Sequence, residues 1–100
     1  MPTTVGIGRV TLYFEDTFSL KDKRRTMRSV TQLVRNTFNA AVAETSDLDD
    51  VRIGTITVAV VSNSSPHADE MLQKVVAFIE SRVEMGVVGE IATELIPVGD

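Results

Sequence analysis

A chain of 100 residues with 43% hydrophobic and 24% charged residues is long enough for one domain with a single core, spanning residues 1–100. Its net charge of −4 argues against coating nucleic acid over the whole surface, and the absence of cysteine excludes disulfides and thiolate chemistry. The N-terminus lacks the basic start and apolar run of a signal peptide, and no apolar run could cross a membrane, so we expect a cytoplasmic protein with no membrane partner.

The first half of the chain predicts a strand, a helix and a second strand. Residues 5–14 alternate between apolar and mixed side chains, which is typical of a strand with one buried face. Ser19 and Asp22 have the spacing of a capping box at the start of a helix, and Asn39 is expected to end that helix. The helix has an apolar stripe consisting of Leu20, Met27, Val30, Val34 and Phe38. Residues 40–45 suit a short strand, followed by an acidic turn over 46–50.

The second half predicts a strand, a helix and a final strand. Residues 52–61 alternate clearly, with many β-branched side chains. Ser65 is expected to cap the second helix, Pro66 suits its first position, and Gly86 should terminate it. Residues 87–96 alternate again, and Pro97 is expected to close that strand. Its predicted apolar face consists of Val87, Ile91, Thr93 and Leu95, opposite Glu90 and Glu94.

The order strand, helix, strand, strand, helix, strand predicts a ferredoxin-like α+β sandwich. Two crossover helices and one hairpin give a four-stranded antiparallel sheet with both helices on one face. No linker or composition change divides the chain.

The distribution of charge is the main functional clue. Residues 21–35 hold six of the ten basic residues and one of the fourteen acidic residues, giving this stretch +5 and the remainder −9. At helical spacing five of these residues form one stripe opposite the apolar one. The stripe consists of Lys21, Arg24, Arg25, Arg28 and Arg35. Cations three and four residues apart repel one another and are disfavoured near a helix N-terminus, so this arrangement indicates an anionic partner.

Other interpretations of the basic residues stay open. The stripe could be an ordinary solvated helix face neutralised by the acids at 47–50 or by Glu15 and Asp16, or a surface for protein binding or self-association. Lys23 falls on the apolar side of the wheel, and we expect its amine to reach solvent beyond the sheet edge. In the alternative, Lys23 is partly buried and holds an acid or a ligand.

The remaining polar residues give no sign of catalysis, a metal or a cofactor. His67 is the single histidine and is expected as a solvated residue at the start of the second helix, without a nucleophile and orienting group around it. Asp47, Asp49 and Asp50 lack the spacing of a calcium loop. Gly6 and Gly8 lie inside a strand, where they indicate a bulge or a close approach of strands. Tyr13 is the one aromatic residue on the predicted open sheet face, so base stacking there is not expected.

The segments SLKDKRRTMRSVTQLVRNTFNAAVAE (19–44), VVSN (60–63), His67 and LQKVVAFIE (72–80) resemble the YlxP-like family of small bacterial proteins. The resemblance runs nearly end to end. It implies a ferredoxin-like fold and carries no catalytic residue and no cofactor. The genes of the family often lie among those for transcription termination, translation initiation and ribosome maturation, which implies, by association, a role near RNA or the ribosome.

Three hypotheses follow. The first is a non-enzymatic module that binds RNA or a ribosomal surface through the first helix, with phosphate contacts from the five stripe residues and from Lys23 and Arg9. The second is a protein-interaction or homodimerisation module that uses the sheet face or its edge strands. The third is a small-molecule activity around Lys23, His67 and the nearby serines, for which the sequence identifies no substrate.

Overall fold

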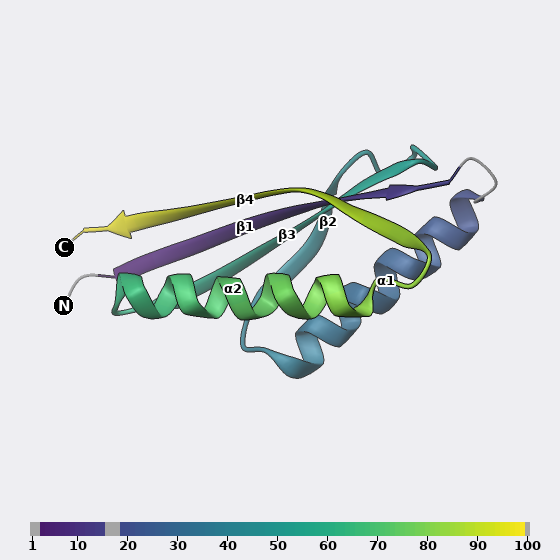
Figure 1. Ribbon diagram of the computed structural model, residues 1–100. Coiled ribbons are helices and arrows are strands. Elements are labelled where there is room, and N and C mark those ends of the chain that lie inside the picture. The colour runs from purple at the N-terminus through teal and green to yellow at the C-terminus, as the bar shows by residue number, and fades with distance from the viewer. Residues whose placement is uncertain (1–2, 16–18, 100) are drawn as a thin grey trace.

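The computed structural model describes residues 3–15 and 19–99, and it has the predicted ferredoxin-like α+β architecture (Figure 1). Four strands form one antiparallel sheet in the order β2-β3-β1-β4. The elements in chain order are β1 (Thr3–Phe14), α1 (Leu20–Thr37), β2 (Ala41–Ser46), β3 (Ile53–Ser62), α2 (Ser65–Arg82) and β4 (Gly86–Val98). The central strands are β1 and β3, so β2 and β4 are the two edges of the sheet.

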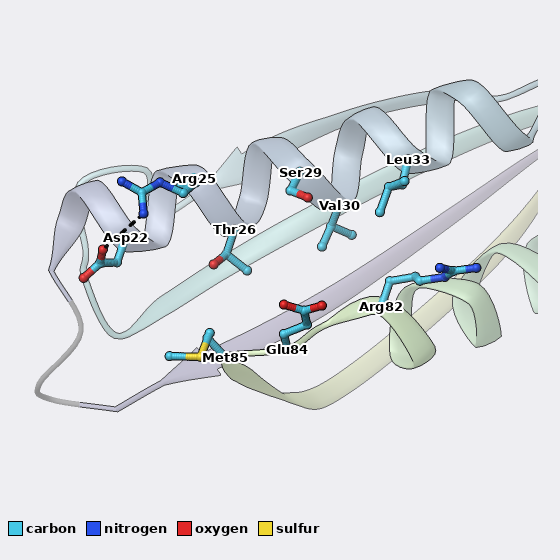
Figure 2. Close-up of a pocket in the computed structure, with 9 residues that line it drawn as sticks. All are labelled: Asp22, Arg25, Thr26, Ser29, Val30, Leu33, Arg82, Glu84 and Met85. Carbon is cyan, nitrogen blue, oxygen red and sulfur yellow. Dashed lines mark ion pairs between the residues drawn. The ribbon is translucent and has the colours of Figure 1, made fainter.

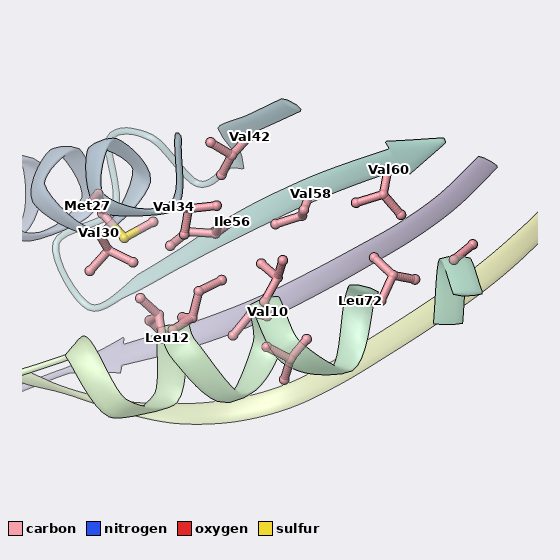
Figure 3. Close-up of a cluster of buried hydrophobic side chains, with 14 of the residues drawn as sticks. Val10, Leu12, Met27, Val30, Val34, Val42, Ile56, Val58, Val60 and Leu72 are labelled. Atoms are coloured by element: carbon pink, nitrogen blue, oxygen red, sulfur yellow. The ribbon is translucent and has the colours of Figure 1, made fainter. Parts of the chain in front are cut away.

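The hydrophobic core lies between the sheet and the two helices, as Figure 3 shows. Alternate residues of β1 and β3, such as Val10 and Ile56, point toward the helices and are fully buried. Helix α1 packs on β2 and β3, and α2 packs mainly on β1 and β3 and also contacts β4. The buried side chains of α1 include Met27, Val30 and Val34, three members of the stripe predicted from helical spacing.

The glycines of β1 permit the close approach of α2. A Cβ added to Gly6 would lie 3.0 Å from Leu72 Cδ1 and 3.0 Å from Val60 Cγ2, whereas one added to Gly8 would lie 3.4 Å from Leu72. Leu72 is fully buried in the space that these glycines leave. The sequence predicted a bulge or a close approach of strands at these glycines, but β1 pairs regularly there and the close neighbour at both is Leu72 of α2.

Most predicted element ends are correct within two residues, and the caps of the helices show where they differ. Helix α1 has the predicted Ser19 capping box, but it ends at Thr37 with Phe38 as the C-cap instead of Asn39. In α2 the cap is Ser64 rather than Ser65, because Ser64 Oγ accepts a hydrogen bond from the His67 amide and Ser65 is already helical. Helix α2 ends at Arg82, and Gly86 begins β4. Neither described helix is long and apolar enough to cross a membrane.

Two expectations about β4 are wrong. The strand continues through Pro97 to Val98, because proline is tolerated on an edge strand, where an amide donor can be dispensed with. The pairing of β4 with β1 shifts register between Val10 and Leu12, where β4 carries an extra residue. This bulge reverses the alternation, so Val87 pairs with Tyr13 and lies on the open face instead of sharing a face with Ile91.

Candidate nucleic-acid interface

Helix α1 begins with a complete capping box that fixes the orientation of the basic residues. Ser19 Oγ accepts a hydrogen bond from the Asp22 amide (3.0 Å), and Asp22 Oδ2 accepts one from the Ser19 amide (3.3 Å). These hydrogen bonds hold the pKa of Asp22 below its usual value, and the nearby charges of Arg25 and Lys21 add to the effect. Asp22 therefore stays ionised at the helix N-terminus, where a negative charge is stabilised.

The five predicted stripe residues are all solvent-exposed on α1, and we call them the basic ridge. The ridge comprises Lys21, Arg24, Arg25, Arg28 and Arg35. Three of its arginines, Arg24, Arg28 and Arg35, line one shallow groove between α1 and the edge strand β2, with a volume of about 280 Å³. By helical rise, Arg24 and Arg35 are about 16 Å apart along the axis. The structure therefore brings these arginines together as a line of guanidinium groups beside the β2 edge.

Intramolecular contacts neutralise the basic ridge only in part. Arg24 Nη2 lies 3.2 Å from Asp49 Oδ1, and the two side chains are 54% and 92% exposed. Arg25 Nη1 is 4.0 Å from Asp22 Oδ1, at the limit of an ion pair. Exposed pairs of this kind contribute about 0–1 kcal/mol, so a polyanion can displace them. Within residues 3–15 and 19–99, Lys21 and Arg28 make no hydrogen bond or ion pair.

Arg35 has a structural contact as well as an exposed guanidinium group. Its Nη2 donates a hydrogen bond to the carbonyl oxygen of Val42 (3.0 Å), which lies on β2. This bond ties the last turn of α1 to the edge strand. The contact leaves other N–H groups of the same guanidinium available to an external acceptor, since arginine has five donors.

Lys23 does not belong to this surface, and the expectation that its amine reaches solvent is wrong. Its side chain is fully buried. The Nζ atom donates hydrogen bonds to the carbonyl oxygens of Asp47 (2.6 Å) and Asp50 (2.8 Å) and lies 3.1 Å from Glu44 Oε2 in an ion pair. That third contact lacks hydrogen-bond geometry, since Glu44 Oε2 has no hydrogen-bond partner within the described chain. The alternative that placed Lys23 in a partly buried contact with an acid describes its position.

The backbone of the β2–β3 turn explains why a lysine is buried there. Asp47 has a positive φ of 59°, and its carbonyl accepts the Asp50 amide (3.0 Å), so both turn carbonyls point toward α1. Gly54 leaves room for the stem of the lysine, because a Cβ there would come within 3.0 Å of Lys23 Cε. The wheel position of Lys23 beside Met27 and Val34 was the signal in the sequence. The turn carbonyls that receive the amine could not be foreseen.

A second, wider groove separates α1 from the end of α2, with a volume of about 540 Å³ (Figure 2). Arg25 lies on the α1 side of the groove and Arg82 on the α2 side. The Arg82 guanidinium also stands 4.9 Å above the centre of the Phe78 ring. Sequence reasoning missed Arg82, because only the packing of α2 beside α1 brings it near the basic ridge. The groove is also lined by Asp22, Thr26, Ser29, Val30, Leu33, Glu84 and Met85.

The open sheet face provides a poor platform for bases. Tyr13 is 39% exposed, and its hydroxyl donates a hydrogen bond to Glu90 Oε2 (2.7 Å). This bond raises the pKa of the Tyr13 phenol and lowers the pKa of Glu90. Arg9 is exposed on the same face, away from the basic ridge. A carboxylate beside the single aromatic residue disfavours an approaching phosphate.

His67 and the acidic turn lie in different parts of the described chain, at the start of α2 and between β2 and β3. His67 is exposed in the first turn of α2. Throughout the described ranges, no group of three or more histidine, cysteine, aspartate or glutamate side chains is placed to hold a metal ion. The turn carbonyls of Asp47 and Asp50 accept hydrogen bonds from Lys23 instead.

Comparison with known proteins gives a family without an assigned function. A family model described as "Protein of unknown function (DUF503)" matches residues 5–90. The chain is 31% identical over 81 residues to a Bacillus subtilis protein named "Uncharacterized protein YlxP". That match covers 81% of this chain and 88% of the relative.

Proposed function

The chain belongs to the DUF503 family, and we propose that it binds the phosphate backbone of a structured RNA through the basic ridge of α1. The observation that carries the proposal is a line of exposed cations on a protein whose net charge is −4. Such a cluster raises the local concentration of a polyanion while the acidic remainder repels it from other surfaces.

The side chains of the ridge suit phosphate better than a carboxylate surface. Four of the five residues are arginines, whose planar guanidinium groups bind phosphate oxygens in a bidentate way. Arg24, Arg28 and Arg35 follow one groove, so their spacing matches successive groups along a strand better than a single small anion. The resemblance to a family encoded beside ribosome-maturation genes favours RNA over DNA.

The proposal excludes Lys23 and Arg9 from the contact surface. Lys23 is buried and already paired, and Arg9 lies on the open sheet face, away from α1. The five residues of the basic ridge carry a formal charge of +5 without Lys23. Asp22 and Asp49 oppose this charge locally. Phosphate contacts of this kind position a protein on RNA and do not read its sequence.

Fluorescence anisotropy with a labelled RNA hairpin tests the proposal. With about five phosphate contacts, the affinity should fall roughly 10²–10³-fold between 50 and 200 mM salt. Arg28→Glu should weaken binding and flatten the salt dependence, whereas Arg28→Lys should preserve most of both. A DNA hairpin of the same sequence and an acidic protein serve as competing partners. Stronger binding to either than to RNA contradicts the proposal.

Lys74→Glu provides the matched control. Lys74 is exposed on α2 and forms an ion pair of 3.1 Å with Glu70, comparable to the pair between Arg24 and Asp49. Reversing its charge changes the net charge as much as Arg28→Glu does but leaves the ridge intact. Equal losses for the two variants would show that RNA responds to net charge alone, and the proposal would fail.

A further inference from the structure

The edge strand β4 exposes apolar side chains on both faces of the sheet. On the helix-facing side, Ile91 is 42% and Leu95 is 38% exposed, because α2 packs mainly on β1 and β3 and covers β4 only in part. On the open side, Val87 and Val98 are also exposed. Figure 1 shows β4 running along the edge of the sheet beside β1. Apolar residues on both faces are typical of a strand whose two faces are covered by other parts of a protein.

Strand β4 keeps only part of the usual protection of an edge strand. Edge strands are commonly short, or carry charged residues, proline or a bulge. Strand β4 has 13 residues with a bulge near its start and a proline near its end, and the charged residues between them are Glu90 and Glu94. The bulge at Gly89 and Glu90 leaves residues 91–98 as a regular stretch whose outer backbone groups have no strand beside them. This stretch is a template for strand addition.

We propose that β4 pairs with β4 of a second copy of this chain, antiparallel, about a two-fold axis at Thr93. A two-fold axis perpendicular to the sheet keeps each side chain on its own face. The axis must therefore lie midway between one residue and the same residue of the second copy, here between the two Thr93 residues. With the axis at Thr93, Ile91 lies opposite Leu95 of the second copy, and the reverse holds. These four side chains cover one another on the helix-facing side, as cross-strand apolar pairs do.

Charge selects this register over its neighbours. An axis at Ala92 would place Glu90 opposite Glu94 of the second copy, and an axis at Glu94 would place that residue opposite itself. Like charges directly opposite one another are destabilising. The axis at Thr93 instead places Glu94 opposite the small Ala92 of the second copy.

Arg9 supplies the partner for Glu94 across this interface. Arg9 pairs with Ala92 in the sheet and, among the described residues, makes no hydrogen bond or ion pair. In the proposed register, Arg9, Ala92 and Glu94 of the second copy lie in one row. Two strand spacings of about 4.8 Å separate the ends of that row, within the combined reach of an arginine and a glutamate. Glu90 already has its partner in Tyr13.

The resulting sheet has eight strands in the order β2-β3-β1-β4-β4-β1-β3-β2. The basic ridge lies beside β2, so both ridges would remain exposed at the two far ends. Pairing through β4 is therefore independent of RNA binding, and either proposal can fail without the other.

Charge exchange between Arg9 and Glu94 tests the pairing by sedimentation velocity over a range of protein concentrations. The wild type should dimerise, and Arg9→Glu or Glu94→Arg should each weaken self-association by at least about tenfold through like-charge repulsion. An equimolar mixture of the two variants should restore the dimer, because each interface then pairs a glutamate with an arginine. The double variant should also dimerise. A wild type that stays monomeric, or a mixture that fails to associate, overturns the proposal.

Cross-linking fixes the register, because the chain has no native cysteine. Thr93→Cys places one thiol from each copy at the axis, and mild oxidation should yield a covalent dimer. Ile91→Cys alone should not cross-link, but a mixture with Leu95→Cys should. Circular dichroism confirms that each variant is folded. A dimer that forms without the Thr93→Cys cross-link would indicate another interface, such as the open sheet face, and would also overturn the proposal.

Discussion

The two edge strands of the sheet, β2 and β4, differ in how far the rest of the chain holds and covers them. At the β2 edge, α1 covers a six-residue strand, Arg35 donates to its backbone, and Lys23 fastens the turn that follows. At the β4 edge, a strand about twice as long keeps several apolar side chains in solvent. One edge is closed by contacts within the chain, and the other is left open. In the two proposals above, the open β4 edge pairs with a second copy of the chain, and the basic ridge lies beside the closed β2 edge.

Adjacent residues of α1 show how the closed edge is built. Lys23 is fully buried with three contacts, whereas Arg24 is exposed with one ion pair, to Asp49. Both residues reach toward the same β2–β3 turn, but from different sides of the helix. Lys23 holds the backbone of the turn, and Arg24 touches its outer surface. The stability of the β2 edge should therefore depend on the first contact and hardly on the second.

The largest expected effect comes from removing the buried amine. Lys23→Met should lower the free energy of unfolding by about 3 kcal/mol, because it leaves the Glu44 carboxylate without its charge partner in a largely buried site. Arg24→Met should cost about 0–1 kcal/mol, as an exposed pair does. Urea denaturation followed by circular dichroism measures both. Adding Glu44→Leu to Lys23→Met should recover part of the loss, and equal effects of the two methionine variants would contradict this account of the edge.

The same structure shows which features of the fold the sequence could predict. The strands and helices follow from local periodicity and from caps such as Ser19, which act within a few residues. The fold order then follows from chain connectivity. The end of α2 and the β4 bulge were missed, because Arg82 and Gly89 carry no local signal that distinguishes them from their neighbours.

The candidate site was less accessible from the sequence than the fold. Helical spacing alone placed the basic ridge on one exposed face. The pairing of Arg24 with Asp49 and the approach of Arg82 to Arg25 join residues at least 25 positions apart, and they depend on packing that no local pattern encodes. The burial of Lys23 could not be predicted, because it depends on two carbonyl oxygens of the β2–β3 turn that accept hydrogen bonds from its amine.

The close packing of α2 on β1 depends on Gly6 and Gly8, and an added methyl group at each position tests it. Gly6→Ala would push against Leu72 and Val60 at 3.0 Å and should cost about 1–3 kcal/mol, as overpacking does. Gly8→Ala meets Leu72 at 3.4 Å and should be neutral or stabilising by about 0.5 kcal/mol, since alanine suits a strand better than glycine. Thermal unfolding compares the two variants. A Gly6→Ala protein as stable as the wild type would show that α2 does not depend on this close contact.

The smallest expected effect concerns two carboxylates, Glu90 on β4 and Asp22 at the start of α1. A hydrogen bond from the Tyr13 hydroxyl lowers the pKa of Glu90 beside β1, and the contacts with Ser19 lower the pKa of Asp22 on α1. A lowered folded-state pKa contributes stability that is present above the unfolded value and is lost as the pH falls through the folded value, here on the acid side of about pH 4. Tyr13→Phe should raise the pKa of Glu90 and leave that of Asp22 unchanged. Ser19→Ala should raise the pKa of Asp22 and leave that of Glu90 unchanged.

Carboxyl NMR titration separates these two effects, because it follows the carboxyl groups of Glu90 and Asp22 individually. In the proposed dimer, Tyr13 keeps Glu90 occupied so that Glu94 alone meets Arg9 of the second copy. Tyr13→Phe should therefore weaken self-association slightly, and more at low salt, by freeing a carboxylate near the interface. Ser19→Ala changes a helix cap at the far edge and should leave self-association unchanged. If the two variants affected dimerisation equally, the edges would not act independently.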